Sequence, residues 1–282
     1  MIEFRNVTKR FGGTTALDRV TLNIKEPGIY SLLGRNGAGK TTLMKLIAGY
    51  IHTGEGEVVV NDQVVTTMNA PSCVQFIESN AVQFNMKVGA LLESARELQS
   101  DFDITFAKRM LERFQLNPDK RFSQLSFGMK TMVTTILSLA NNSIVLLLDE
   151  PVLGFDAIVR SQFNALLHES FELHPRIIIV STHLIDEIAK ITQKLIIINN
   201  GKILLQAGIE DIDENAYVLT GPSSALTPAL KGLNVIGREV IGGMLAAYIF
   251  GKRITPPSGV LLDRLSLQDF FIKLVEGDVQ HA

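Results

Sequence analysis

The chain of 282 residues contains a single cysteine, Cys73, and no tryptophan. One cysteine excludes an intrachain disulfide and a zinc site built on several thiolates, and it is typical of a protein that works in the reducing cytosol. We interpret Cys73 as a small buried residue. Stability must come from a packed apolar core, for which the hydrophobic content of 46% is sufficient.

An excess of charge of either sign is missing as well. The 27 basic residues nearly balance the 29 acidic ones, which leaves a net charge of -2 without any basic tail or block. Because nonspecific nucleic-acid binding relies on basic residues that neutralise phosphates, we predict no nucleic-acid partner.

Long hydrophobic runs are also lacking. The N-terminal MIEFRNVTKRF has no apolar signal core, and no run approaches the roughly 18 residues that span a bilayer, so any membrane role is expected to come through a partner.

What the sequence does contain is the pattern of an α/β core. The runs SIVLLLDE, from Ser143, and RIIIVST, from Arg176, are continuously apolar, which is typical of central strands in a parallel sheet covered on both faces. GIYSLLG, from Gly28, leads into a helix with one apolar face, and KLIIINNGKILLQAG, from Lys194, predicts two strands joined by a turn. The alternating N-terminal residues predict further strands.

Two other regions differ from this core. Between about residues 86 and 140 the pattern becomes helical, and in ITFAKRMLERFQL the apolar residues recur every three or four positions. Further along, short segments broken by glycines predict strands, and SLQDFFIKLVEG predicts a final helix with a capping box at Ser266 and Asp269. We therefore expect a helical insertion in the core and a small α+β extension over residues 208–282.

A phosphate-binding loop (P-loop) is predicted by GRNGAGKT, which matches G-x-x-x-x-G-K-[ST] between a predicted strand and a predicted helix. Its glycines let the backbone wrap closely around a phosphate, while successive N–H groups and the helix N-terminus supply partial positive charge. A glycine turn followed by a surface lysine is the plainer alternative, which this context disfavours. We expect Lys40 to reach the β and γ phosphates and the Thr41 hydroxyl to ligand Mg²⁺. The predicted nucleotide-binding residues here are Gly34, Arg35, Asn36, Gly37, Ala38, Gly39, Lys40, Thr41 and Thr42.

Two carboxylates end the apolar strand in SIVLLLDEP. Asp149, at the tip of the strand, is expected to hold the Mg²⁺ or its waters as the second part of a P-loop metal site. Glu150 is one residue further and is expected to orient or deprotonate a water that attacks the γ phosphate. Any strand can end in an acidic turn, but beside a P-loop the metal and water roles explain both residues.

These segments occur together with LSFGM at 125–129, GFDA at 154–157 and STH at 181–183. In this order and rough spacing, the sequence resembles the ATP-binding subunits of ABC transporters over about residues 1–207. The resemblance implies an α/β P-loop NTPase (ABC ATPase) core with an antiparallel β subdomain and a helical signature subdomain at about residues 79–140, followed by the small C-terminal α+β extension. It also implies ATP and Mg²⁺ as cofactors.

Several residues take their expected roles from this resemblance alone. Phe11 resembles the aromatic residue that stacks on adenine, and Asp156 belongs to the loop that couples two sites. His183 resembles the histidine that contacts the γ phosphate, and it joins Glu150 among the predicted catalytic residues. The signature segment is expected to close on ATP held by the opposite subunit, so that two chains share each active site; it comprises Leu125, Ser126, Phe127, Gly128 and Met129. From the residues alone, Ser126 fits a helix N-cap and His183 a structural or solvated side chain.

The sequence departs from the family pattern at three positions. Phe127 stands where glycine is usual and Met129 where glutamine is usual, although this LSxGM form is similar to that of drug and antimicrobial-peptide exporters. The position usually held by a glutamine that contacts Mg²⁺ falls on Glu78, with Gln75 and Gln83 as nearby alternatives. We therefore predict Glu78 as a third metal ligand.

The predicted function is that of an ATP-hydrolysing subunit. It would dimerise around two ATP molecules with an identical or paralogous ATPase subunit and power transport by separate integral membrane subunits. By resemblance to bacitracin-type and toxin-peptide exporters, the cargo is an amphipathic peptide or a drug, and the membrane subunits dock around residues 79–100. The chain is then expected at the cytoplasmic face of a bacterial cell membrane, held there by these partners.

Two other function classes fit parts of the sequence. A soluble ABC ATPase of translation or DNA repair would need no membrane partner. Repair types place a long coiled coil between P-loop and signature, and translation types carry two cassettes in one chain, whereas this sequence has neither sustained heptads nor a second cassette. An ordinary P-loop kinase or GTPase would leave LSFGM, GFDA and STH unexplained.

Overall fold

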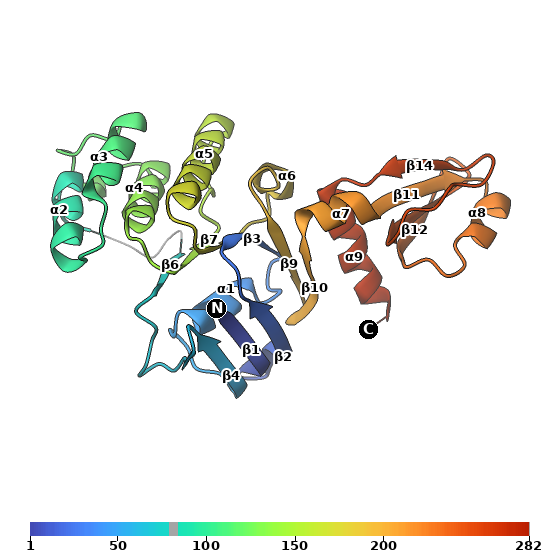
Figure 1. Cartoon of the computed structure of the whole chain (residues 1–282), viewed down its shortest axis with the longest axis horizontal. Helices are drawn as coiled ribbons and strands as arrows, with labels where there is room; N and C mark the ends of the chain where they lie inside the picture. The colour runs from blue at the N-terminus through green and yellow to red at the C-terminus, as the bar shows by residue number, and fades with distance from the viewer. Residues whose placement is uncertain (79–83, 282) are drawn as a thin grey trace.

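The computed structural model describes residues 1–78 and 84–281, and it confirms the predicted α/β fold (Figure 1). The N-terminal sheet contains β1 (Ile2–Phe11), β2 (Thr14–Ile24), β4 (Glu55–Val60) and β5 (Gln63–Val64). Its strands are antiparallel in the order β2-β1-β4-β5. Along β1, the side chains of Ile2, Phe4 and Val7 are fully buried, so one face of this sheet covers one side of the core.

The central sheet carries the apolar runs found in the sequence. It contains β3 (Gly28–Leu33), β6 (Val74–Glu78), β7 (Val145–Asp149), β8 (Ile177–Ser181), β9 (Lys194–Asn199) and β10 (Lys202–Gly208), in the order β10-β9-β3-β8-β7-β6. All neighbours pair in parallel except β9 and β10, which form a hairpin whose turn places Asn200 and Gly201 at positive φ. Leu146 and Leu148 point to one core and Val145 and Leu147 to the other, which explains why β7 has no polar face.

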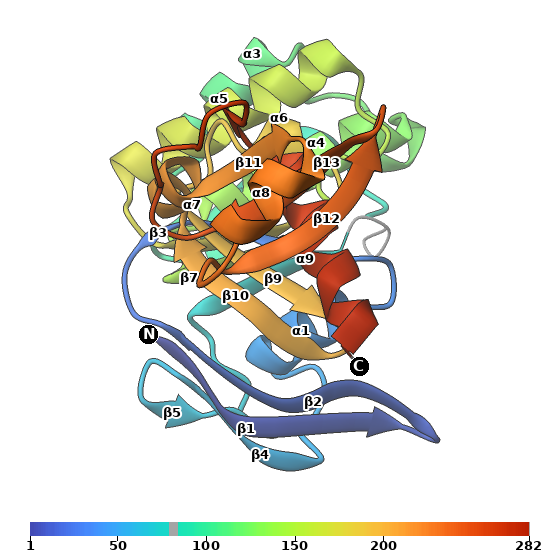
Figure 2. The ribbon, with the colours of Figure 1, turned by 90° about the vertical axis from the view of Figure 1, so that its right-hand side faces the viewer.

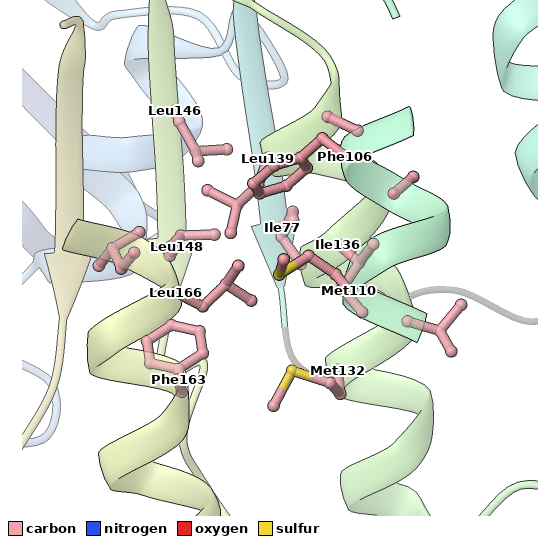
Figure 3. Packing of buried hydrophobic residues seen from close by; sticks show 14 of the residues in the cluster. Ile77, Phe106, Met110, Met132, Ile136, Leu139, Leu146, Leu148, Phe163 and Leu166 are labelled. Carbon is pink, nitrogen blue, oxygen red and sulfur yellow. The ribbon is translucent and has the colours of Figure 1, made fainter. Parts of the chain in front are cut away.

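Helices cover the face of the central sheet that the N-terminal sheet leaves open. They are α2 (Val88–Leu98), α3 (Ile104–Arg113), the short 3-10 helix η1 (Phe122–Gln124), α4 (Phe127–Ala140) and α5 (Ala157–Leu173). Figure 3 shows the packing: Phe106 and Met110 from α3 and Ile136 and Leu139 from α4 belong to one buried cluster with Leu148 of the sheet. On the other face, α1 (Lys40–Ile47) lies between the two sheets. Helices thus occur in the region where the sequence predicts a helical insertion, of which residues 79–83 lie outside the described part.

The C-terminal segment forms a sheet of its own at the opposite end of the long axis from α2 and α3 (Figure 1). It consists of α7 (Ile209–Asn215), β11 (Ala216–Gly221), α8 (Ser223–Ala229), β12 (Val235–Ile241), β13 (Met244–Phe250), β14 (Leu261–Arg264) and α9 (Leu267–His281), with the antiparallel order β12-β13-β11-β14. The strands broken by glycines are therefore confirmed, with Gly242 and Gly243 in the β12–β13 turn. The division into two domains at residue 207 stays a prediction.

The last helix joins this segment to the rest of the molecule (Figure 2). At its start, the Ser266 hydroxyl accepts a hydrogen bond from the Asp269 N–H (3.0 Å) and donates one to the Asp269 carboxylate (2.7 Å). The carboxylate therefore bonds the capping hydroxyl, whereas in a full capping box it would bond the Ser266 N–H. The short helix α6 (Ile185–Ile188) lies next to α9. Within residues 1–78 and 84–281, no helix is both long and apolar enough to cross a membrane.

Arg176 ties the helices to the sheet at the amino ends of the central strands. Its side chain is 4% exposed, and it donates hydrogen bonds to the carbonyls of Asn141 (3.0 Å) and Leu139 (3.1 Å) and to the Ser170 hydroxyl (2.7 Å). Burial lowers the pKa of Arg176 to about 10. The guanidinium still carries its charge at neutral pH, and it sits at the negative end of the α4 dipole.

We predict that Arg176→Met destabilises the fold by about 2 to 4 kcal/mol, because the buried Leu139 carbonyl and the buried Ser170 hydroxyl lose their hydrogen bonds to the guanidinium. Urea unfolding followed by circular dichroism measures this. The matched control is Arg96→Met, which removes an exposed arginine paired with Glu93 and is expected to cost no more than about 0.5 kcal/mol. Equal unfolding midpoints for the two variants would contradict the role given to Arg176.

Candidate active site

The carboxyl ends of four parallel strands gather the polar residues singled out in the sequence. The P-loop follows β3, and the register aligns Glu78 at the end of β6 with Asp149 at the end of β7. The same register aligns Asp149 with Ser181 at the end of β8. In open parallel sheets this edge is where ligands bind. Residues separated by about 100 positions in the chain therefore meet here because each ends a strand of the same sheet.

The P-loop packs too tightly against the sheet to accept side chains at its first and last glycines. A Cβ on Gly34 would lie 2.5 Å from the Ile198 carbonyl oxygen, and one on Gly39 would lie 2.7 Å from that of Ala16. Gly39 also has a φ of 114°, in the left-handed region that glycine tolerates best. Close packing thus fixes the loop from which α1 begins.

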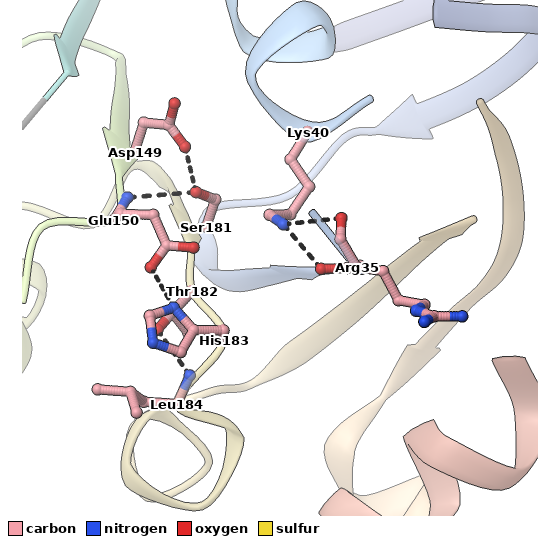
Figure 4. Close-up of polar contacts among 9 residues, drawn as sticks. Arg35, Lys40, Asp149, Glu150, Ser181, Thr182, His183 and Leu184 are labelled. Carbon is pink, nitrogen blue, oxygen red and sulfur yellow. Dashed lines mark hydrogen bonds and ion pairs between the residues drawn. The ribbon is translucent and has the colours of Figure 1, made fainter. Parts of the chain in front are cut away.

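Lys40 is buried at the start of α1 and folds back over the loop. Its Nζ donates hydrogen bonds to the carbonyl oxygens of Gly34 (2.7 Å) and Arg35 (3.3 Å), as Figure 4 shows. Burial lowers the pKa of Lys40, and the charges of Glu150 and Asp149 oppose that shift. Lys40 thus lies near two of the carboxylates that line the pocket.

Asp149 links two strands and the first turn of α1. Thr41 Oγ1 donates to Asp149 Oδ2 at 2.6 Å, and Ser181 Oγ donates to Asp149 Oδ1. Asp149 is only 7% exposed, so these two hydroxyls fix a carboxylate that is almost completely buried. Thr41 and Asp149, which the sequence predicts as metal ligands, are thus in direct contact.

Glu150 points away from Asp149 because the backbone turns sharply between them. Its φ of 50° lies in the left-handed region, and its N–H donates to the Ser181 carbonyl (3.1 Å) and hydroxyl (3.2 Å). The Glu150 carboxylate lies 2.9 Å from Nδ1 of His183 (Figure 4). The two residues predicted to be catalytic are therefore hydrogen-bonded to each other, on a turn that Ser181 supports.

A cavity of about 590 Å³ lies in front of these residues. Residues 36–42 of the P-loop line it together with Glu78, Asp149 and Glu150. The Glu78 carboxylate also forms an ion pair with Lys45 Nζ of α1 at 2.8 Å. Of the alternatives to Glu78, Gln75 does not line this cavity, and Gln83 lies outside the described residues. The structure thus places Glu78 at the cavity, paired with a lysine.

Three sets of predicted residues lie away from this cavity. Phe11 ends β1 with 50% of its surface exposed, and Lys9 Nζ is 5.0 Å from its ring centre. Ser126 is exposed and caps α4 by accepting from the Met129 N–H (3.3 Å). Asp156 caps α5 by accepting from the Val159 N–H (2.9 Å). The chain therefore does not bring its own signature segment to its own P-loop.

Phe127 contacts the loop that follows Glu150. A Cβ on Gly154, which has a φ of 78°, would come within 3.1 Å of the Phe127 ring, so the ring covers that glycine closely. A Cβ on Gly128 would lie 3.4 Å from the Phe155 ring, an ordinary contact distance. Leu153, beside Gly154, lines the cavity. The aromatic residue that departs from the family pattern thus connects the signature segment with the loop between Glu150 and Asp156.

Comparisons with known proteins agree with this arrangement. The sequence profile of the family described as ABC transporter matches residues 17–153. The spermidine/putrescine import ATP-binding protein PotA of Nitrosospira multiformis is 31% identical over 271 residues, which cover 92% of this chain and 73% of that protein. The chain belongs to the ABC transporter ATP-binding subunits.

Two further comparisons extend the match to the ends of the chain and to the fold. The bacitracin transport ATP-binding protein BcrA of Enterococcus faecalis is 25% identical over 300 residues, which cover 98% of this chain and 97% of BcrA. A dimeric, post-hydrolysis structure of the ATP-binding cassette MJ0796 with ADP and Pi has a TM-score of 0.63 and 23% identity, over 74% of this chain and 99% of that one. This chain therefore has the ABC ATPase fold, and its membership of the ABC transporter ATP-binding subunits makes it an ATPase.

Two residues of the ABC subunit's site have no role in the sequence-based prediction. Ser181 belongs to the STH motif, but its contacts with Asp149 and Glu150 depend on the β7–β8 register, which the sequence does not specify. A hydroxyl at the end of a strand beside an acidic strand end is the signal that could identify it. Lys45 is one turn after Thr41 on α1, so helical spacing alone could have placed it near the cavity.

We predict that Ser181→Ala lowers the rate of ATP hydrolysis roughly 10- to 100-fold, because Asp149 loses a hydrogen bond and the turn at Glu150 loses its support. Steady-state phosphate release and ATP binding are measured on the same preparation, and binding is expected to persist. Ser138→Ala is the control, since it also removes a buried hydroxyl, one that bonds only within α4. Wild-type turnover in Ser181→Ala would contradict this role.

Proposed function

We propose that this ABC transporter ATPase binds ATP with Mg²⁺ at its P-loop, closes into a dimer with a second ATPase subunit, and drives export of an amphipathic peptide or drug through separate membrane subunits. One observation carries the ATP-dependent part: Thr41, Asp149 and Ser181 form a bonded cluster at the P-loop, beside the bonded pair of Glu150 and His183. In this arrangement, groups suited to a metal-bound phosphate adjoin groups suited to an attacking water.

Nucleotide binding is assigned to the cavity at residues 36–42. The N–H groups at the start of α1 and the buried Lys40 supply positive charge for the β and γ phosphates. Lys40 Nζ would exchange its bonds to the Gly34 and Arg35 carbonyls for phosphate oxygens. Phe11 is exposed at the end of β1, and we assign it the adenine ring, which gains from stacking on an aromatic face.

The donors at this cavity fit Mg²⁺. Magnesium prefers oxygen ligands and is usually held by one or two carboxylates together with substrate phosphates. Thr41 supplies a hydroxyl, while Asp149 and Glu78 supply carboxylates that end neighbouring strands. Among the described residues, no three His, Cys, Asp or Glu side chains form a metal cluster, so the phosphates complete the ligand set. Once bound, Mg²⁺ would neutralise charge on the β and γ phosphates.

Hydrolysis is assigned to Glu150 and His183. Glu150 lines the cavity, and its carboxylate would accept a hydrogen bond from the attacking water. His183 Nδ1 lies 2.9 Å from that carboxylate, and we assign its imidazole the contact with the γ phosphate. The turn at Glu150, fixed by Ser181, keeps the acid apart from Asp149, so that one carboxylate serves the metal and the other serves the water.

Dimerisation follows from the position of the signature segment. Ser126 is exposed and caps α4 away from the chain's own cavity, together with the N–H groups that begin that helix. An exposed helix N-terminus with a hydroxyl suits a phosphate. We therefore assign residues 125–129, with Asp156 in the neighbouring loop, to ATP held by a second subunit, which is either an identical chain or a paralogue.

Export is supported by likeness to BcrA, whose name refers to bacitracin transport and whose length this chain matches almost completely. PotA, which is named as an importer, shows that sequence identity alone does not fix direction. We assign the docking of membrane subunits to residues around 79–100, of which the structure describes 84–100, and place the protein at the cytoplasmic face of a bacterial membrane. Residues 1–207 would form the ATPase domain and 208–282 a separate extension.

The dimer is tested with Glu150→Gln, which is expected to bind ATP without turnover. Light scattering with ATP and Mg²⁺ should give twice the molar mass found without nucleotide. Adding Ser126→Arg should abolish this dimer, because the larger charged side chain replaces the phosphate-facing hydroxyl. Ser123→Arg, three residues earlier and also exposed, is the matched control and should leave the dimer intact.

A monomer under all conditions, with ATP binding retained, would rule out a homodimer and leave a paralogous subunit as partner. A dimer that persists in the Ser126→Arg variant would contradict the role given to the signature segment.

The assignment of Glu78 is tested by the Mg²⁺ dependence of ATP hydrolysis. We predict that Glu78→Ala raises the Mg²⁺ concentration for half-maximal rate about tenfold, as loss of a group in a metal's immediate surroundings usually does. Gln75→Ala should leave that concentration unchanged, since Gln75 does not line the cavity. The reverse result would move the role to Gln75.

A further inference from the structure

The C-terminal helix α9 forms one wall of a second cavity beside the P-loop. This cavity has a volume of about 390 Å³. It is lined by Phe271 of α9, by Arg35 and Asn36 of the P-loop, and by His183 and Ile185, among other residues. Figure 4 shows Arg35 and His183 on two neighbouring loops, with α9 at the lower right. A residue 88 positions beyond the predicted catalytic histidine therefore faces the same space.

The contact extends into a shared core. Leu33, the last residue of β3, immediately precedes the P-loop, and Ile185 begins α6 two residues after His183. Both are buried in the same cluster as Phe270 of α9, and Phe271 packs against that cluster. Phe270 is in turn fixed by an edge contact with Phe250 of β13, with ring centres 5.1 Å apart. The C-terminal extension therefore packs, through one apolar cluster, against residues next to the P-loop and next to the loop that carries His183.

We propose that Phe271 is a positioning residue for ATP hydrolysis: it holds the loop of residues 182–185 so that His183 stays bonded to Glu150. The proposal rests on the catalytic roles assigned to that pair. His183 is half-exposed, and the short α6 begins only two residues beyond it, so this loop has little structure of its own to keep it in place. Packing of Ile185 against α9 supplies that support.

The expected effect is on turnover and not on ATP binding. Lys40 and the N–H groups of α1 lie in the first cavity, which Phe271 does not line. Displacement of a catalytic group by a fraction of an ångström lowers the chemical rate, while ground-state binding changes little. The extension then acts as part of the catalytic framework, although it lies outside residues 17–153 matched by the family profile.

The test is a double-mutant cycle on the full chain. We expect Phe271→Ala to lower kcat about fivefold with KM for ATP nearly unchanged, and Phe271→Leu to recover most of the rate. In the background of His183→Ala, the substitution at Phe271 should have no further effect, because both changes remove the same interaction. Ile272→Ala, an exposed neighbour on α9 that does not line the cavity, is the matched control and should keep wild-type turnover.

Two results would overturn the proposal. If His183→Ala abolishes turnover while Phe271→Ala leaves kcat unchanged, the positioning role fails and the catalytic assignment stands. If His183→Ala keeps full turnover, the catalytic assignment itself fails, and the positioning role fails with it. Multiplicative losses in the double variant would likewise show that Phe271 does not act through His183.

Hydrogen exchange on the unmutated protein gives a second measurement should Phe271→Ala fail to fold. Because α9 holds the loop of residues 182–185 in this proposal, the peptide that contains His183 and the α9 peptide that contains Phe271 should open together, so that dilute urea speeds exchange in both. Faster exchange in the α9 peptide with unchanged exchange in the His183 peptide would contradict the proposal.

Discussion

The site depends on the pair of hydrogen bonds that the Asp149 carboxylate accepts. The carboxylate accepts one hydrogen bond from the hydroxyl of Thr41 on α1 and another from the hydroxyl of Ser181 on β8, and Asp149 is itself the last residue of β7. A buried carboxylate is costly unless it is hydrogen-bonded, so the three elements must assemble together for the charge to be tolerated. The same hydrogen bonds fix the position of α1 relative to the strand ends. They thereby set the distance between the P-loop and the carboxylates, which a metal-bound phosphate must span.

From this carboxylate the chemistry divides into two parts. The positive φ at Glu150 turns the next side chain away from Asp149 and toward His183. Two adjacent acids in the sequence thereby occupy different environments: Asp149 is buried between hydroxyls, whereas Glu150 is more exposed and bonded to an imidazole. Such a separation is what an ATPase requires of a metal ligand and a water-orienting acid. It results from one backbone turn whose N–H is held by Ser181.

The sequence was sufficient to predict the sheet, the helical region and the P-loop, because each rests on local periodicity or on a short motif. Contacts set by strand register were beyond its reach. The sequence does not specify the register that bonds Ser181 to Asp149 or the packing that pairs Lys45 with Glu78, since these contacts join residues 32 and 33 positions apart across strands and helices. The packing of Phe271 beside the P-loop is more distant still, and the periodicity of α9 indicates only that it has an apolar face. The role assigned to Phe11 depends on bound ATP, those assigned to Ser126 and Asp156 depend on a second subunit, and all three remain predictions.

The contact between Phe127 and Gly154 makes two positions dependent on each other. A large ring at 127 leaves no room for a side chain at 154, whereas a chain with glycine at 127 would keep only the restriction that the positive φ at 154 imposes. Relatives of this protein with a bulky residue at the first position should therefore carry glycine at the second. A substitution that restores the common glycine at 127 would uncover the loop next to Leu153 and so loosen the wall of the cavity. The departure from the family pattern at Phe127 thus also affects a loop of the same subunit.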